Sequence, residues 1–183
     1  VELCRSMLHY FEPSGDFAWQ SLDVFSPVTG EIAGIITDRP ELEMIIRAQE
    51  YPDFEFHLFN LSPLESLRAG NAVRAGERIG SYVERQTPAA VAVSVNTTRG
   101  RRLISWFDVI ADSLWHIYGR CGIGNSSEFI ISKEARDADP LTCSNGLFTT
   151  AGRLENWAVM NCHWDVDGWG APRFVDVNYI DFD

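Results

Sequence analysis

Three aspartates near the C-terminus have the types and spacing of calcium ligands. Asp165 and Asp167 stand in the segment Asp-Val-Asp-Gly-Trp-Gly, and Asp176 follows near the position of a last carboxylate ligand. Calcium loops alternate oxygen ligands in this manner, although a full loop ends in a glutamate. The segment therefore predicts either a calcium site at Asp165, Asp167 and Asp176 or a hairpin turn that uses Asp and Gly for backbone reasons.

The four cysteines form a second candidate set. Cys4, Cys121, Cys143 and Cys162 are an even number at long spacings, which predicts two disulfides among three possible connectivities. We favour Cys4–Cys162 and Cys121–Cys143, and free cysteines in the core are the alternative. A metal site that combines Cys162 with the adjacent His163 has no recognised zinc spacing. Disulfides favour a location outside the reducing cytoplasm, in the periplasm, at the cell surface or secreted.

Aromatic residues gather in the last thirty or so positions. Trp157, Trp164, Trp169 and Tyr179 occur there, and exposed tryptophans often stack on sugar rings. Trp164 and Trp169 are therefore candidates for glycan binding. The alternative interpretation places them in a core or an interface.

Composition limits the possible partners. The 183 residues carry a formal net charge of -11, with 26 acidic against 15 basic residues. A nucleic-acid-binding protein needs a surplus of basic residues, so the composition argues against nucleic acid. No run approaches the roughly 20 apolar residues of a membrane span. The chain begins at Val1, which is the basis for expecting a removed leader or a longer N-terminus.

The elements that must position these residues are mostly short strands separated by Gly, Pro, Asn and Asp turns, as in a mainly β fold. Alternation and turn residues predict strands at 22–30 and 31–37, a hairpin over 42–59 and a central strand at 89–95. Further strands are expected at 128–132, 156–164 and 173–182. The last two form a C-terminal hairpin, within a loop-rich remainder.

One segment has helical rather than alternating spacing. Phe107, Ile110, Leu114 and Tyr118 repeat at helical intervals and predict one amphipathic helix at about 104–118. Ser105 can cap the start of such a helix. No linker interrupts the chain, so we expect residues 1–183 to form a single domain.

Four short motifs resemble those of the lysostaphin-type (LytM-like) zinc endopeptidases. Residues 26–32, Ser-Pro-Val-Thr-Gly-Glu-Ile, are similar to the strand and turn of that family. Residues 70–80, Gly-Asn-Ala-Val-Arg-Ala-Gly-Glu-Arg-Ile-Gly, are similar to its Gly-x-x-Val turn. Phe56-His57-Leu58 resembles its Tyr-x-His-Leu strand, and Asp16 matches the aspartate of His-x-x-x-Asp. The resemblance implies a LytM-like antiparallel β barrel or sandwich over residues 9–110, with 111–183 as a helix end and an extension.

The resemblance also implies a zinc site, but most of the ligands of that site are absent from this sequence. Glu12 stands where the family has the histidine of His-x-x-x-Asp, and the strand at 89–95 has no His-x-His. Only Asp16 and the vestigial catalytic residue His57 remain. A site with substituted ligands would use Asp16, Glu12 and His9, but zinc needs about four ligands. We therefore expect a degenerate relative of these endopeptidases that is not an enzyme and requires no cofactor.

These observations lead to three functional hypotheses. The first is a bacterial envelope protein that binds peptidoglycan or an envelope partner without cleaving it. The second is a zinc endopeptidase with substituted ligands, in which His57 acts as the acid or base. The third is a glycan-binding module that uses Trp164 and Trp169.

Overall fold

A computed structural model describes residues 8–11, 22–37, 42–83, 89–120, 122–126 and 129, and the backbone of 143–144 and 147–148. The chain divides into two compact units. Described residues up to Ala111 belong to one unit and those from Asp112 belong to the other. A mainly β, antiparallel fold with one α-helix is confirmed. The expectation of a single domain stays a prediction.

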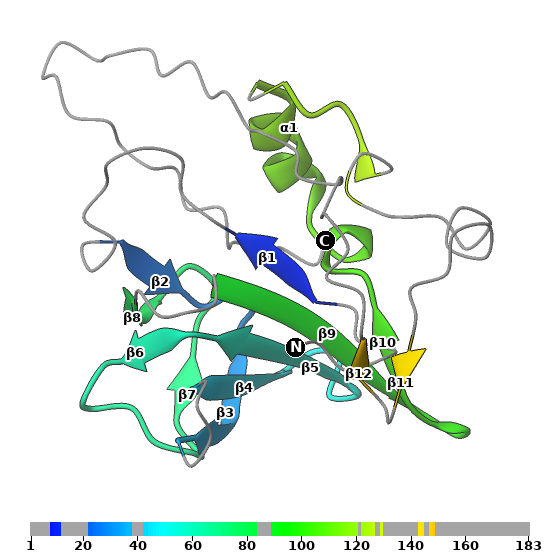
Figure 1. The fold of residues 1–183 in the computed structure, drawn as a ribbon. Helices are drawn as coiled ribbons and strands as arrows, with labels where there is room; N and C mark the ends of the chain where they lie inside the picture. The colour runs from blue at the N-terminus through cyan, green and yellow to red at the C-terminus, as the bar shows by residue number, and fades with distance from the viewer. Residues whose placement is uncertain are drawn as a thin grey trace, which may run out of the picture. The chain divides into compact units, whose positions relative to one another are not determined.

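The larger unit is built on a seven-stranded antiparallel sheet (Figure 1). Strand β9 is its longest member, and β1 and β10 pair successive parts of one edge of β9 while β5 pairs the other edge. Strands β4, β3 and β7 continue the sheet beyond β5. The strands are β1 (His9–Phe11), β3 (Gly30–Ile36), β4 (Glu43–Ala48), β5 (Phe54–Phe59), β7 (Ala72–Val73), β9 (Ala89–Thr97) and β10 (Gly100–Ile104).

The predicted hairpin over 42–59 is confirmed as β4 and β5, with the Tyr51 turn between them. Alternation along these strands separates two faces of the sheet. One face carries the apolar core, in which Met44, Ile46 and Phe56 are completely buried. Val91 and Val93 of β9 lie on the same face, because Leu58 and Phe56 pair with them directly. The opposite face carries the polar side chains of the same three strands.

A second, three-stranded sheet lies in the same unit and has the order β2-β8-β6. Its strands are β2 (Asp23–Phe25), β6 (Leu61–Pro63) and β8 (Arg78–Tyr82). The glycine-rich segment before β8 forms turns in which Gly70 and Gly76 have φ values of 88° and 74°. Such left-handed positions favour glycine because it has no Cβ. This explains why the segment similar to the family's Gly-x-x-Val turn contains glycines at these points.

Two other motif glycines are required by close backbone approach rather than by φ. A Cβ on Gly30 would overlap the carbonyl oxygen of Arg47, and a Cβ on Gly80 would overlap that of Ser62. Neither obstacle can move without disturbing a paired strand, because β3 pairs with β4 and β8 pairs with β6. The glycines therefore allow the strands to pack.

Replacing Gly30 by alanine is expected to lower the free energy of unfolding by about 2 kcal/mol, since the added methyl forces β3 and β4 apart. Gly34→Ala is the matched control in the same strand, because a Cβ at Gly34 meets nothing within 4 Å. Urea denaturation followed by circular dichroism measures both variants. An equal loss in the two variants would show that close packing at Gly30 is unimportant.

The predicted helix begins later than the periodicity indicated. Gly100, at φ 98°, turns the chain so that residues up to Ile104 pair with β9 as strand β10. Ser105 then caps a short 3₁₀-helix, Trp106–Asp108, by accepting a hydrogen bond from the Phe107 N–H. The α-helix, α1, spans Asp112–Arg120. Sheet pairing therefore takes Ile104 from the predicted helix, and the 3₁₀-helix that follows Ser105 replaces its first turns.

The smaller unit contains α1 and the residues that follow it. Asp112 in the first turn and Arg120 in the last turn suit the helix dipole. Gly122, at φ 90°, turns the chain, and Ile123 N–H bonds the Tyr118 carbonyl at 3.0 Å. The rings of Trp115, Tyr118 and Phe129 pack at centroid distances of 5.6–6.4 Å.

The remaining described residues form a short hairpin of β11 (Cys143–Ser144) and β12 (Leu147–Phe148), which the sequence analysis assigned to a loop-rich region. The strands predicted at 128–132, 156–164 and 173–182 lie outside the described residues, apart from Phe129, which is in a turn. Within the described part of the chain, every helix is too short or too polar to cross a membrane.

Candidate functional site

The polar face of the large sheet holds a buried cluster of Glu43, His57 and Ser94, one residue from each of three adjacent strands. His57 pairs across the sheet with Ile45 of β4 and Ala92 of β9. Glu43 lies two residues before Ile45 and Ser94 lies two residues after Ala92, so each side chain is a diagonal neighbour of His57 on the same face. Their exposed fractions are 6%, 5% and 0% for Glu43, His57 and Ser94.

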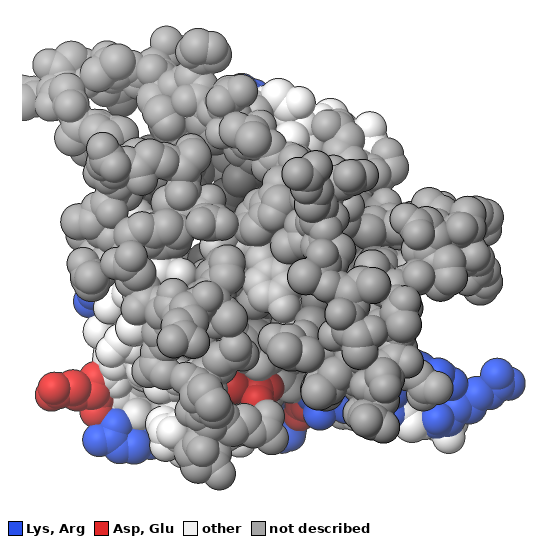
Figure 2. All heavy atoms as spheres, in the orientation of Figure 1, with Lys and Arg blue, Asp and Glu red and all other residues white. Residues whose placement is uncertain are grey.

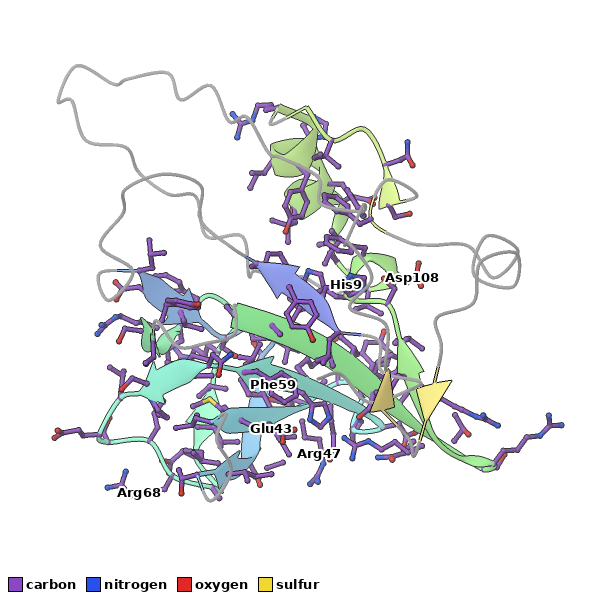
Figure 3. All side chains as sticks on the ribbon, viewed as in Figure 1. His9, Glu43, Arg47, Phe59, Arg68 and Asp108 are labelled. Carbon is purple, nitrogen blue, oxygen red and sulfur yellow. The ribbon has the colours of Figure 1, made fainter. Side chains whose placement is uncertain are left out.

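Both ring nitrogens of His57 have partners within the protein. Nδ1 lies 2.6 Å from Glu43 Oε1, and Nε2 lies 3.1 Å from Ser94 Oγ. The Nη2 of Arg101, from β10, also contacts Nε2. A guanidinium can only donate, so Nε2 presents its lone pair and the proton on Nδ1 is donated to Glu43. Figure 3 labels Glu43 on β4, with Arg47 nearer the other end of the same strand.

Arg101 connects this buried cluster to an exposed ion-pair group. Its Nη2 lies 3.2 Å from Glu55 Oε2, and Arg47 Nη2 lies 2.9 Å from Glu55 Oε1. The Glu55 carboxylate is only 13% exposed, whereas the side chains of Arg47 and Arg101 are 47% and 48% exposed. Glu55 therefore orients two guanidinium groups that still face solvent.

The order Glu43, His57, Ser94 has the hydrogen-bond connectivity of a serine hydrolase triad. A nucleophilic serine must be reached by substrate, and Ser94 is completely buried in the middle of β9. Arg101 also contacts the nitrogen that would have to accept the serine proton and occupies the lone pair that would take it. The arrangement therefore serves as a structural hydrogen-bond network across three strands rather than as a nucleophile site.

His9 occupies a different environment, on the opposite face of the sheet. It pairs with Val91, whose side chain belongs to the apolar face, and its ring packs edge-on against Phe107 at 4.7 Å. Ser105 Oγ accepts from the Phe107 N–H and lies within hydrogen-bond distance, 3.0 Å, of His9 Nε2. Burial lowers the pKa of His9 from 6.5 to about 4. His9 therefore supports the 3₁₀-helix as a neutral ring.

The lowered pKa of His9 predicts acid sensitivity. Below pH 6.5 the unfolded chain binds a proton that the folded chain refuses until about pH 4, so stability is lost as the pH falls through this window. We expect His9 to account for about 2 kcal/mol of that loss, less than full burial would give because the ring is partly exposed. Urea midpoints of wild type and His9→Gln at pH 7 and pH 4.5 measure it. The variant keeps an acceptor for Ser105, and an equal loss in both proteins would contradict the assignment.

The positions of His9 and His57 bear on the expected zinc site. They lie on opposite faces of one sheet, so one ion cannot bind both side chains. His57 has a guanidinium beside Nε2, which repels a cation, and His9 faces an apolar core. The described residues therefore do not fit zinc, and they contain no group of three His, Cys, Asp or Glu side chains that could hold a metal.

The other candidate residues cannot be placed beside these two. Glu12 and Asp16, the calcium candidates Asp165, Asp167 and Asp176, and the glycan candidates Trp164 and Trp169 lie outside the described residues. The same holds for Cys4, Cys121 and Cys162, and only the backbone of Cys143 is described. The predicted disulfides and these sites therefore stay predictions.

Sequence reasoning missed Glu43, Ser94 and Arg101 as partners of His57. A signal was present, because Glu43 and Ser94 are polar residues inside strands whose other members are mostly apolar. Their alternation with buried residues could have placed them on one face. Their meeting at His57 depends on strand order, which no local pattern specifies.

One open pocket of about 390 Å³ lies near the ends of β3 and β6, beside the start of β4. Its lining is mainly apolar and includes Ile35, Leu42 and Leu64, with Arg68 at its margin. The Arg68 guanidinium is held on its own loop, where Nη1 contacts the carbonyl oxygens of Glu65 and Leu67. Figure 3 labels Arg68 well away from Glu43 and Arg47. The pocket is therefore mainly apolar, and its one arginine is engaged by the backbone of its own loop.

Comparison of this chain with known protein families, with curated proteins and with solved structures finds no match.

Proposed function

We propose that this chain is a non-catalytic binding protein of the bacterial cell envelope, acting outside the cytoplasm, with peptidoglycan as its ligand. An envelope protein is the alternative partner. The proposal combines the resemblance of residues 9–110 to lysostaphin-type endopeptidases with the geometry around His57. The resemblance alone would favour an enzyme, and the geometry favours binding without cleavage.

The observation that carries the proposal is the engagement of both His57 ring nitrogens. The residue at the family's catalytic position donates to Glu43 and accepts from Ser94 and Arg101. A general acid or base must reach its substrate within hydrogen-bond distance. His57 is 5% exposed, and both of its ring nitrogens are hydrogen-bonded within the protein. These properties suit a structural residue rather than a catalytic one.

Two measurements on the purified protein test this function. Co-sedimentation with purified peptidoglycan is expected to show saturable binding. Incubation of the same material with the protein and added zinc is expected to release no soluble fragments. Fragment release that a chelator and His57→Ala both abolish would establish the substituted-ligand endopeptidase instead. Absence of binding in co-sedimentation would remove peptidoglycan as the ligand, and cross-linking in envelope fractions would then test the protein partner.

A further inference from the structure

The β9–β10 hairpin concentrates positive charge in a strongly acidic chain. Residues 89–107 contain three arginines and no aspartate or glutamate, although the whole chain has a net charge of -11. Figure 2 shows arginine side chains gathered at the lower right, where Figure 1 places the tip of this hairpin. This segregation of charge indicates a local anion-binding surface rather than a generally basic protein.

The turn of the hairpin is held in one conformation. Thr97 Oγ1 donates to the Gly100 carbonyl at 2.6 Å and accepts from the Arg99 N–H at 3.2 Å. Gly100 supplies the left-handed φ that the turn requires. The arginines that follow are therefore presented from a preformed element, which reduces the entropy lost on binding.

Alternation along β10 divides its arginines between the two faces of the sheet. Arg101 lies on the face of His57, which it contacts, and Arg102 lies on the opposite face. Leu103 pairs with Ser94 and shares the face of Arg101, where it is 38% exposed. Arg47 reaches the same face from β4, since both guanidinium groups bond the Glu55 carboxylate. We call Arg47, Glu55, Arg101 and Leu103 the arginine face.

We infer that the arginine face binds the free carboxylates of short peptides, and specifically the peptide stems of peptidoglycan; this inference rests on the proposed function. Each guanidinium has five N–H donors in a planar fork that matches a carboxylate, and Glu55 and His57 use only some of them. Glu55 acts as a positioning residue that holds the guanidinium groups of Arg47, from β4, and Arg101, from β10, on one face of the sheet.

The ligand class follows from the charges and from Leu103. A long polyanion would be repelled by a chain of net charge -11, whereas a short segment meets only the local field of the arginine face. The exposed Leu103 offers an apolar contact beside the two guanidinium groups, which suits the small aliphatic side chains of a peptide. A carboxylate on a short peptide therefore fits this surface better than a continuous run of closely spaced charges.

Co-sedimentation at one fixed ionic strength tests the inference with three preparations of peptidoglycan. The first is native, the second has its carboxylates converted to amides, and the third has been freed of phosphate-bearing polymers with hydrofluoric acid. Wild type is expected to bind the native and phosphate-free preparations equally and the amidated one about tenfold more weakly. Loss of binding to the phosphate-free material would assign the ligand to phosphate and overturn the inference.

A second set of binding experiments compares arginine variants on the two faces of the sheet. Arg47→Ser is expected to weaken binding about tenfold, and Arg101→Lys should weaken it because the charge remains but the fork is lost. Arg102→Ser removes the same charge from the opposite face and is expected to change binding less than about twofold. An equal effect of Arg47→Ser and Arg102→Ser would reduce the contact to general electrostatics and overturn the inference.

The outcomes separate this inference from the proposed function. Wild type that binds native and amidated peptidoglycan equally, with Arg47→Ser unaffected, overturns the arginine face and leaves peptidoglycan binding intact. Wild type that binds no preparation removes the proposed function itself. Arg47 forms a half-exposed ion pair with the partly exposed Glu55, so Arg47→Ser is expected to fold like the wild type.

Discussion

Glu43→Leu is expected to lower the free energy of unfolding by about 3 kcal/mol, because it leaves the Nδ1–H of His57 buried without an acceptor. The two residues are 6% and 5% exposed and lie 2.6 Å apart between Oε1 and Nδ1. Removing one partner of such a pair leaves the other desolvated in the fold. Urea denaturation at pH 7, followed by circular dichroism, measures the loss.

A paired replacement distinguishes the cost of an orphaned partner from the value of the pair. Glu43→Leu combined with His57→Phe fills the same space with apolar groups and should recover more than half of the loss seen in Glu43→Leu. If the double variant is less stable than the wild type by the sum of the losses of Glu43→Leu and His57→Phe, the two residues act independently, which would contradict the network described above.

An exposed ion pair provides the matched control. Asp23 and Arg78 lie 2.5 Å apart between Oδ1 and Nε, with side chains 44% and 46% exposed. Asp23→Asn is expected to cost less than about 1 kcal/mol, since water screens the pair and solvates the remaining partner. A loss as large as that of Glu43→Leu would mean that burial does not set the difference.

The second large effect is expected at Trp106. Its side chain is completely buried in the 3₁₀-helix and packs edge-on against Phe56 at 6.3 Å. Trp106→Ala would leave a cavity against the apolar face of the sheet and is expected to cost about 4 kcal/mol. Leu103→Ala, at an exposed position three residues earlier, should cost less than about 0.5 kcal/mol.

Trp106→Phe separates the packing of the ring from its polar atom. The indole Nε1 is buried and has no hydrogen-bond partner within the described part of the chain. Phenylalanine keeps an aromatic ring against Phe56 and removes the unpaired N–H, so the variant should lose no more than about 1.5 kcal/mol. A loss equal to that of Trp106→Ala would show that the indole N–H has a partner essential to the fold.

The sequence by itself determined the mainly β class and several strands of the large unit, namely β3, β4, β5 and β9. Alternation in β4 and β5 identified the hairpin because side chains change face at each residue, and the β-branched run at 89–95 marked β9. The motif glycines at positions 30 and 80 are local features, and their close backbone contacts explain why glycine is found there.

Only the tertiary structure decided where the predicted helix starts and which residues meet at His57. Local propensity favoured helix from 104, but pairing with β9 carries the chain through Ile104 and delays α1 to Asp112. Likewise, the separation of His9 from His57 follows from pairing. His9 lies opposite Val91 and His57 lies opposite Ala92, so a one-residue difference on β9 places the two rings on opposite faces. Register is a property of strands far apart in the chain, which is why residue spacing could not supply it.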